Sequence, residues 1–525
     1  MKTPHIILAM ALIALASTPA VAVLAPEPES TLSMPDRKTT TFTSATSADT
    51  SRAVAVWRQF DGAHERIQAR SLEIGQWGPT AVLSSSNGDA GSPQVAVSPS
   101  GENAVAVWVL EDGNESIVQS RWFSNGTWGV LKQVGTDTEA AVPQVDITSD
   151  GGTALVMWRE GSGADRTIRV AWGHDGQWDA PDDLTAPGTD SVTPTMDLSD
   201  DGTRAIALWR RYAGGYYNVE STEWAGSTWS PPQWLSASVQ TTSPDVALVD
   251  GGAVATWVEV RDATLRVLSA RRAAGQWGEE DVLSAQGSNA YTPVLDTAGS
   301  TAAVAWRRDD SGTGVVEAVV DAGTGWGATQ TLSRPGESSF DPHVSLSKDG
   351  ASAMAVWTQA VGQLRKVTGA HYDDGSWDMP VDVSSVSALA GSPTVLVDES
   401  ANSGVAFWRG HSGTFGVLRT SRVRNIDDAI TPPATGRSTP AAVTGLRVKV
   451  RKRYARVSWQ RGEAANSYRV VVKKRGSKKV RIRTVSAPRT RFAVTKGRYR
   501  VKVSGINAVG QGPSDAKRFK VPPKR

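Results

Sequence analysis

The feature that most constrains this chain is a pair of tryptophans, 20 residues apart, that recurs along most of its length. The first member of the pair occurs in eight copies spaced 48 to 51 residues apart, and seven copies also carry the second member. Together they account for 15 of the 20 tryptophans, so the period reflects repeated structural units. The first tryptophans are Trp57, Trp108, Trp158, Trp209, Trp257, Trp306, Trp357 and Trp408, and the second are Trp77, Trp128, Trp178, Trp229, Trp277, Trp326 and Trp377.

Each copy is predicted to form four short strands. In the second copy, residues 93–98 begin with a proline, residues 104–108 are apolar on both faces, and residues 116–122 alternate polar and apolar positions. A turn dipeptide, Asn125-Gly126, precedes the fourth strand. A lone sheet of this size cannot bury both faces, whereas copies stacked around an axis can. We therefore expect an all-β fold with an eight-bladed β-propeller; seven blades is the alternative if one copy is irregular.

The two ends of the repeat array predict how the ring closes. The eighth copy has three strands but no second tryptophan at position 428. Near the N-terminus, residues 31–33 have the same Thr-Leu-Ser sequence as residues 331–333 and precede the first copy at a similar distance. We expect this N-terminal segment to supply the missing outer strand of the eighth blade.

Composition and charge divide the chain into four parts. A short positive start, an apolar run over residues 6–16 and Ala20-Val21-Ala22 predict a signal peptide over residues 1–22. The propeller is then assigned to residues 23–424, a Thr- and Pro-rich linker to 425–439, and a basic domain to 440–525. We expect a secreted protein, associated with the cell envelope, without a transmembrane segment. The absence of cysteine excludes disulfides and fits a bacterial exported protein.

The repeat style resembles that of a known group of proteins. Residues 93–98, 103–108 and 126–129 resemble the uncharacterised propeller-like repeats of secreted actinobacterial proteins, and the resemblance extends over about residues 27–424. It implies the fold and export, but no activity.

The basic domain is similar to fibronectin type III domains over its whole length. The matching positions are Pro440, Leu446, Trp459, Tyr468, Tyr499 and the segment 503–514. This resemblance implies a β-sandwich in which Trp459, Tyr468 and Tyr499 are core residues.

The charge of this domain departs from what solubility requires. Residues 440–525 hold 26 Lys and Arg against two acidic residues, whereas the rest of the chain has a balance of −21. The basic residues alternate with apolar ones along the predicted strands, which places them on solvent faces. We expect an anionic extracellular polymer as the partner; nucleic acid is disfavoured because the aromatics lie in the core. The candidate polyanion-binding residues are Arg469, Lys473, Lys474, Arg475, Lys478, Lys479, Arg481, Arg483, Arg498, Arg500 and Lys502.

The propeller offers one repeated polar position. The residue after the first tryptophan is arginine in five copies, and a position repeated around a ring puts these guanidinium groups on one face. They are candidates for binding an anionic or hydroxyl-rich ligand, with ion pairs to loop aspartates as the structural alternative. The tryptophans themselves are interpreted as packing residues rather than a sugar-binding platform. The five arginines are Arg58, Arg159, Arg210, Arg307 and Arg409.

No catalytic motif, metal-ligand spacing or cofactor fingerprint is recognisable, so no catalytic residue, metal or cofactor is assigned. The leading hypothesis is a monomeric, non-catalytic binding or adhesion protein whose basic domain attaches it to a polyanion and whose propeller presents a face to a glycan or protein. The alternative is a polysaccharide-active protein, either a glycoside hydrolase with a carboxylate pair assembled across blades or an accessory carbohydrate-binding module.

Overall fold

The computed structural model describes residues 23–426, except 74, 136–138, 237–238, 400, 402 and 414, and residues 442–522, except 452–453, 461–466, 476, 478–479, 486–487 and 508–509. The chain divides into two compact units, residues 1–429 and 430–525, and every regular element of the described residues is a strand. No membrane-spanning helix is found in this part of the chain. The predicted signal peptide and most of the predicted linker lie outside the described residues.

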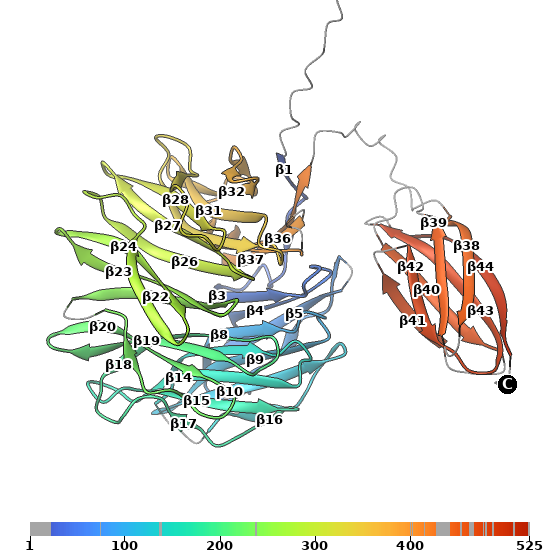
Figure 1. Ribbon diagram of the computed structural model, residues 1–525, viewed down its shortest axis with the longest axis horizontal. Coiled ribbons are helices and arrows are strands. Elements are labelled where there is room, and N and C mark those ends of the chain that lie inside the picture. The colour runs from blue at the N-terminus through green and yellow to red at the C-terminus, as the bar shows by residue number, and fades with distance from the viewer. Residues whose placement is uncertain are drawn as a thin grey trace, which may run out of the picture. The chain divides into compact units, whose positions relative to one another are not determined.

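The first unit, the propeller-like unit, consists of eight antiparallel sheets that follow one another in chain order (Figure 1). We number them sheets 1 to 8, and each repeat contributes its strands to one sheet. Sheet 1 consists of β3 (Thr39–Thr46), β4 (Arg52–Phe60), β5 (Glu65–Glu73), β6 (Gln76–Trp77) and β7 (Ala81–Val82), and sheet 2 of β8 (Asp89–Val97), β9 (Asn103–Asp112), β10 (Glu115–Ser124), β11 (Thr127–Trp128) and β12 (Lys132–Gln133). Sheet 3 consists of β13 (Ala141–Ile147), β14 (Thr153–Glu160), β15 (Thr167–His174), β16 (Gln177–Trp178) and β17 (Asp182–Asp183), and sheet 4 of β18 (Ser191–Leu198), β19 (Ala205–Ala213), β20 (Tyr216–Trp224) and β21 (Gln233–Trp234).

The other four sheets have the same order of strands. Sheet 5 consists of β22 (Thr241–Val249), β23 (Gly252–Arg261), β24 (Thr264–Ala273) and β25 (Gln276–Val282), and sheet 6 of β26 (Ala290–Ala298), β27 (Thr301–Asp310), β28 (Thr313–Asp321) and β29 (Gln330–Thr331). Sheet 7 consists of β30 (Ser339–Leu346), β31 (Ala353–Val361), β32 (Leu364–Asp373), β33 (Ser376–Trp377) and β34 (Val381–Asp382). Sheet 8 consists of β35 (Gly391–Val397), β36 (Ser403–Ser412) and β37 (Phe415–Ile426) with the N-terminal strands β1 (Val23–Pro26) and β2 (Ser30–Thr31).

The first strand of each sheet contacts the first strands of its two neighbours. These contacts run from β3 through β8, β13, β18, β22, β26, β30 and β35, and β35 contacts β3 again. The cycle of contacts, together with the antiparallel sheets, makes the fold all-β and β-propeller-like.

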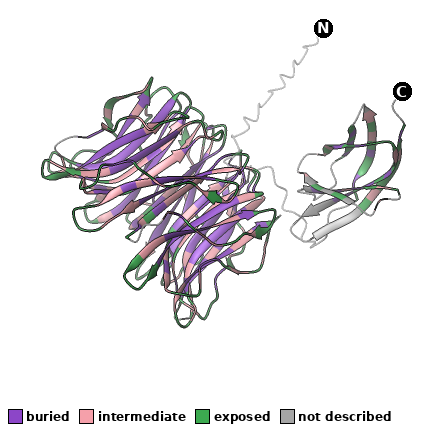
Figure 2. Ribbon diagram, turned by 90° about the horizontal axis from the view of Figure 1, so that it is seen from below, coloured by how far each residue is buried: buried purple, intermediate pink, exposed green. Residues whose placement is uncertain are grey.

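The repeated tryptophans hold adjacent sheets together. The first tryptophan of every copy is at most 1 % exposed, and each packs in a cluster that joins two consecutive sheets. Trp178 and Trp277, two of the second tryptophans, donate their indole N–H to serines of the preceding sheet, Ser120 and Ser221, at 2.8 Å each. The interpretation of the tryptophans as packing residues is confirmed. Figure 2 shows the resulting buried cores along the middle strands of the sheets.

The N-terminal strands complete sheet 8, as the sequence predicts. β1 pairs with β37 from Val23↔Ile426 to Pro26↔Val423, and β2 pairs with the same strand at Thr420 and Arg419. Figure 1 shows β1, in blue, beside β37, in orange. Leu32 is 2 % exposed and packs with residues of both sheet 1 and sheet 8. Two segments from opposite ends of the unit therefore form one sheet.

The start of each inner strand contains a β-bulge. In seven sheets the residue that precedes the repeat proline has φ between 47° and 50°, and the register with the second strand shifts at that point. Such a conformation costs a non-glycine residue on the order of 1 kcal/mol or more. Because it recurs around the unit, we attribute it to the architecture and not to one binding site. The residues are Ser92, Val142, Thr193, Ser243, Thr292, Asp341 and Ser392.

The C-terminal unit is a sandwich of two antiparallel sheets. A three-strand sheet has the order β38-β39-β42, and a four-strand sheet has the order β41-β40-β43-β44. Trp459, Tyr468 and Tyr499 are all buried in the core between them, which confirms their predicted role. The strands are β38 (Thr444–Arg451), β39 (Tyr454–Gln460), β40 (Ser467–Lys474), β41 (Val480–Val485), β42 (Arg489–Ala493), β43 (Gly497–Asn507) and β44 (Gly510–Val521).

Candidate functional site

The five repeated arginines project from the ends of the second strands, but their partners differ. Arg58 pairs with Glu65 at 3.4 Å, and Arg307 donates to Asp309 at 2.6 Å. Arg210 and Arg409 instead donate to backbone carbonyl oxygens of the following sheet, Thr241 at 2.7 Å and Thr40 at 3.4 Å. These four side chains are therefore occupied by structural interactions.

Arg159 differs from the other four. It makes no hydrogen bond or ion pair with any residue that the structure describes. Its Nε atom is buried, as are those of Arg58, Arg307 and Arg409. Burial and the nearby Arg166 both lower the pKa of Arg159, while Glu160 opposes this effect. A half-buried guanidinium beside another cation and without a bonded acceptor is a candidate for binding an anion.

Arg166 organises the surroundings of Arg159 across sheets 3 and 4. Its Nε donates to Asp190 at 2.7 Å and its Nη2 donates to the Tyr217 hydroxyl at 2.7 Å, which in turn donates to Asp190 at 2.9 Å. Arg210 lies over the Tyr217 ring, 5.2 Å from its centroid. Burial lowers the pKa of Arg210, and the positive charge of Arg166 adds to this effect. We call Arg159, Arg166, Asp190, Arg210 and Tyr217 the arginine cluster.

Exposed apolar side chains gather at the same end of the sheets. Seven of them lie in or beside the hairpins that join the second and third strands, where the arginine cluster also lies, whereas others, such as Val82, Val130 and Met379, lie in the outer segments of the sheets. Among the described residues, the hairpins between the first and second strands carry no exposed large apolar side chain. The two ends of the propeller-like unit therefore differ in chemistry, and the apolar end is the better candidate for a partner. Its exposed side chains include Phe60, Tyr212, Tyr216, Val260, Val361, Leu364 and Phe415.

Four aspartates on the inner strands bridge neighbouring sheets. Each accepts the backbone N–H of the next inner strand: Leu198 donates to Asp146 at 3.1 Å, Leu248 to Asp197 at 2.6 Å, Leu295 to Asp245 at 3.1 Å and Leu346 to Asp296 at 2.7 Å. An edge strand leaves such N–H groups unpaired, so the carboxylates complete the hydrogen bonding at the inner edge of each sheet. These residues were not singled out from the sequence, although an aspartate recurs 10 to 12 residues before the tryptophan in four copies.

The environment of these aspartates favours their neutral form. Burial, and then the neighbouring Asp146, raise the pKa of Asp197 to about 8, and burial raises the pKa of Asp245 and Asp296 to about 6 each. Asp146 and Asp197 are close enough to influence each other's ionisation, as a pair of catalytic carboxyls would be. Because both also accept backbone N–H groups, a structural role accounts for the pair.

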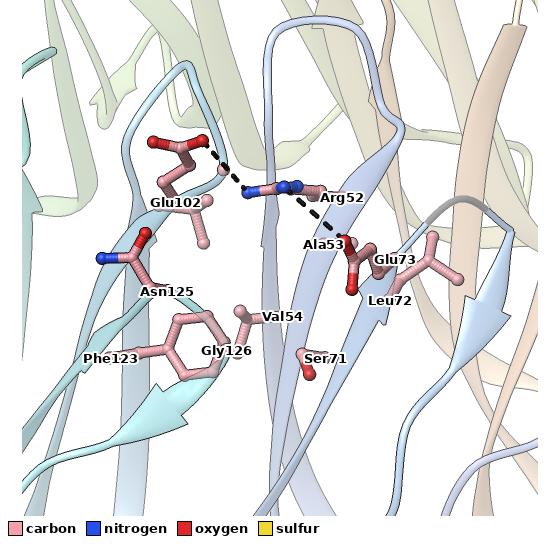
Figure 3. Close-up of a pocket in the computed structure, with 12 residues that line it drawn as sticks. Arg52, Ala53, Val54, Ser71, Leu72, Glu73, Glu102, Phe123, Asn125 and Gly126 are labelled. Atoms are coloured by element: carbon pink, nitrogen blue, oxygen red, sulfur yellow. Dashed lines mark ion pairs between the residues drawn. The ribbon is translucent and has the colours of Figure 1, made fainter. Parts of the chain in front are cut away.

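A pocket of about 170 Å³ lies between sheets 1 and 2 (Figure 3). Arg52 crosses it and forms ion pairs with Glu73 at 3.6 Å and Glu102 at 3.9 Å. It is smaller than the roughly 300 Å³ at which ligand pockets begin, and its central cation is already paired. None of the candidate residues lines it. In the described part of the chain, no group of three or more His, Asp or Glu side chains is arranged to hold a metal ion.

The C-terminal unit presents a basic face on its four-strand sheet. Lys473 lies directly opposite Arg500 on β43, and Arg500 lies directly opposite Arg518 on β44, so three cations form one row across three strands. All three are exposed, and no ion pair occurs among the described residues of this unit. We call this surface the four-strand face; its basic residues are Arg469, Lys473, Arg498, Arg500, Lys502, Arg518 and Lys520.

The strand register separates the other candidates from this face. Arg481 and Arg483 lie opposite the core residues Val472 and Val470, and each donates to a backbone carbonyl oxygen of the edge strand β42. Lys474 contacts the Tyr499 ring and donates to the Thr495 hydroxyl. Two further candidates, Lys478 and Lys479, lie outside the described residues, and Arg475 is exposed in the turn after β40.

Arg518 and Lys520 were not singled out from the sequence, although they alternate with Phe519 as the other basic residues alternate with apolar ones. Their membership of the face depends on the pairing of β43 with β44, which places Lys520 opposite Arg498.

No family model matches the sequence, and no curated protein matches it significantly. The propeller-like unit is similar to solved structures at low identity. One match is a prolyl endopeptidase, with 16 % identity over 62 % of this chain and 47 % of that chain and a TM-score of 0.38. Another is a subtype N11 neuraminidase-like protein (A/flat-faced bat/Peru), with 10 % identity over 75 % of this chain and 95 % of that chain and a TM-score of 0.37. The chain thus spans about half the length of the prolyl endopeptidase.

Two smaller solved structures match a shorter part of the chain. A structure described as a myokine is 24 % identical over 16 % of this chain and 98 % of that chain, with a TM-score of 0.15. A variant named FN3tt is 11 % identical over 16 % of this chain and 97 % of that chain, with the same TM-score.

Proposed function

We propose that this protein is an exported, non-catalytic binding protein that attaches to an anionic extracellular polymer through its C-terminal unit. In this proposal the eight sheets are the blades of an eight-bladed propeller, and the C-terminal unit is a fibronectin type III domain. A tyrosine corner supports the latter assignment, because the Tyr499 hydroxyl donates to the Thr495 carbonyl oxygen at 3.0 Å, four residues upstream.

The row of Lys473, Arg500 and Arg518 carries the proposal. Side chains directly opposite each other in an antiparallel sheet have Cβ atoms about 5 Å apart, and like charges at that distance destabilise the sheet. At ~6 Å in water each pair of unit charges repels by about 0.7 kcal/mol. A bound polyanion removes this repulsion and releases its counterions, so the row favours a ligand that carries several negative charges.

The propeller-like unit supplies a second binding face in this proposal. The arginine cluster and the exposed Tyr212 and Tyr216 lie at its apolar end. Guanidinium groups bind carboxylates through paired N–H donors, and exposed tyrosine rings contribute to contacts with sugars and proteins. We therefore place a glycan or protein ligand at this end, with Arg159 as its first anion-binding residue.

The enzyme alternative has less support. The neighbouring carboxyls Asp146 and Asp197 of the inner strands accept backbone hydrogen bonds that join adjacent sheets. A polysaccharide-active role thus has no assigned catalytic residue.

The attachment is tested with the full-length chain and two anionic polymers, a glycerol-phosphate teichoic acid and polygalacturonate. We expect binding to both at low ionic strength, with an affinity that falls steeply as salt is added. A variant with Lys473→Thr, Arg500→Thr and Arg518→Thr is expected to bind less polymer per chain at saturation. Lack of binding by the unmodified chain at 50 mM salt would contradict the proposal.

The matched control removes three charges from the propeller-like unit, with Lys38→Thr, Lys348→Thr and Arg365→Thr. All three are exposed. Equal losses of bound polymer in the two triple variants would show that net charge alone determines binding, and would argue against a defined face.

A further inference from the structure

The C-terminal unit carries a second basic face, on its three-strand sheet. On the three-strand sheet, Lys449 lies directly opposite Arg456 on β39, and Arg456 lies directly opposite Arg491 on β42. This is again a row of three cations across three strands. We call this surface the three-strand face; its exposed basic residues are Arg447, Lys449, Arg456, Arg489 and Arg491.

Among the residues that the structure describes, the three-strand face also has no compensating acidic group. Arg491 lies over the Tyr454 ring, 5.3 Å from its centroid, and none of the basic residues of this face forms an ion pair with a described residue. Asp515, the one described carboxylate of this unit, belongs to β44 of the other sheet and lies opposite the core residue Val503. In the propeller-like unit, by contrast, many basic residues form ion pairs with Asp or Glu.

The two faces point away from each other. Sheets of a β-sandwich pack about 10 Å apart, and outward side chains of Arg and Lys add several ångströms on each side. Two polymer segments on opposite faces are therefore separated by more than two Debye lengths at physiological ionic strength, where the Debye length is about 8 Å. Binding of one segment does not repel a second segment on the other face.

The edge between the sheets keeps the faces distinct. Arg481 and Arg483 bridge from β41 to the backbone of β42, and Arg483 also lies over the core residue Phe492 at 5.3 Å. Their guanidinium groups are engaged in closing the sandwich, so they do not form a continuous basic band around the edge.

The spacing of the cations indicates the ligand class. Alternate residues along one strand are about 6.8 Å apart and neighbouring strands about 4.8 Å apart, as at Arg498, Arg500 and Lys502 on β43. A flexible polymer with one negative charge every ~5–7 Å of its length matches this grid. Phosphate-linked and uronic-acid polymers both satisfy that requirement.

We infer that the C-terminal unit binds two segments of an anionic polymer at once, one on each face, and thereby cross-links the polymer. This inference rests on the proposed attachment function and extends it, because a tether needs one face whereas a cross-linker needs two. The unit then acts as a bridge between two chains of a wall or matrix polymer.

The test uses the full-length chain, with calorimetric titration of short oligomers and light scattering of long polymers. The short probe is an oligogalacturonate of about eight residues, and a glycerol-phosphate oligomer of similar length forms the second arm. We expect two oligomers per chain for at least one of the two chemistries. With long polymer and sub-stoichiometric protein, we expect scattering to rise at least fivefold and to reverse in 1 M salt.

Two triple variants separate the faces. One carries Lys473→Thr, Arg500→Thr and Arg518→Thr; the other carries Lys449→Thr, Arg456→Thr and Arg491→Thr. Each is expected to bind one oligomer per chain and to lose the rise in scattering. The propeller triple variant described above is the matched control and keeps both.

The outcomes are distinguishable. No oligomer binding by the unmodified chain overturns the attachment itself, whereas one oligomer per chain, or loss of all binding in either triple variant, overturns only the two-face inference. If a triple variant fails to fold, the stoichiometry of the unmodified chain and the single variants Arg456→Thr and Arg500→Thr still decide the question. Scattering that persists in both triple variants would assign cross-linking to another part of the chain.

Discussion

Lys473 and Arg500 lie directly opposite each other on β40 and β43, and Arg518 continues the row on β44. A natural sheet usually places opposite charges, or a charge and a neutral residue, in such pairs. Here the described residues of the unit offer no carboxylate to this face. The arrangement therefore lowers the stability of the unit unless an external anion is bound.

We expect Arg500→Thr to stabilise the C-terminal unit at low ionic strength by about 0.5 kcal/mol, because it removes the central charge of the row and introduces a residue that favours strands. Hydrogen exchange of β40 and β43 in the full-length chain measures this change locally. The gain should disappear above about 0.5 M salt. Lys473→Arg, which keeps the charge, serves as the control and should leave exchange unchanged; faster exchange in Arg500→Thr at low salt would contradict the electrostatic account.

The closure of the propeller-like unit can be tested at Leu32. This side chain is buried among Trp57, Phe407 and Leu418, which belong to sheets 1 and 8. We expect Leu32→Ala to lower the free energy of unfolding by about 2–4 kcal/mol, as for other buried leucines. Met34→Ala, two residues away at a side chain that is 44 % exposed, should change it by less than about 0.5 kcal/mol. Similar effects of the two substitutions on thermal unfolding would argue against closure by the N-terminal segment.

Equivalent arginines of the repeat should respond differently to the same substitution. Arg210→Gln removes hydrogen bonds to the Thr193 hydroxyl and the Thr241 carbonyl oxygen, and we expect a loss of about 1–3 kcal/mol. Arg159→Gln breaks no bond to a described residue and relieves repulsion from Arg166, so stability should stay within about 0.5 kcal/mol or rise. Chemical denaturation of the two variants measures the difference. Equal destabilisation would mean that Arg159 has a structural partner.

The inner aspartates predict a pH dependence of stability. The pKa of Asp197 is raised to about 8, whereas an aspartate in an unfolded chain has a pKa of about 4. The folded state therefore holds a proton that the unfolded state releases, and this contribution is complete below about pH 4 and is lost as the pH rises toward 8. The slope reaches up to about 1.4 kcal/mol per pH unit for one proton. We expect the melting temperature to fall between pH 5 and pH 8.

Asp197→Asn should reduce this slope, since asparagine does not ionise, even if it lowers stability at every pH by losing one acceptor. The comparison is Asp201→Asn, a hairpin residue of the same sheet whose pKa is lowered to about 2 by hydrogen bonds from Thr203 and Ser199. Because Asp201 is already ionised above pH 5, its replacement should leave the slope unchanged. An unaltered slope in Asp197→Asn would show that the proton resides elsewhere.

Much of the architecture follows from residues that repeat. The sequence predicts the buried tryptophans and the strand lengths, because burial on both faces requires the same apolar pattern in every copy. It also predicts the pairing of the N-terminal segment with the last sheet. The role of the inner aspartates could not be predicted from the sequence. Their role depends on an N–H group about 50 residues away in the next sheet, as in the bond from Leu248 to Asp197.

For the candidate binding residues, too, the sequence predicts one part of the arrangement and the tertiary structure decides the other. Alternation along β43 predicts that Arg498, Arg500 and Lys502 share a face, and they do. The resemblance to fibronectin type III domains also groups Arg481 and Arg483 with them in one sheet, yet the pairing of β40 with β41 puts those two residues opposite the core valines. The period of a strand fixes which of its residues share a side, but only the register with its neighbour fixes which side that is.

By itself, therefore, the sequence determined that this protein is built from a repeated four-strand unit followed by a basic strand-rich domain, because periodicity and composition are local properties of the chain. The tertiary structure decided which cations are free and which are occupied. Arg159 has no bonded partner among the described residues, whereas its equivalents have one. Lys473 is aligned with Arg500, and Lys449 with Arg456, on opposite faces of the sandwich. Those relationships depend on contacts between residues distant in the chain, which no local pattern specifies.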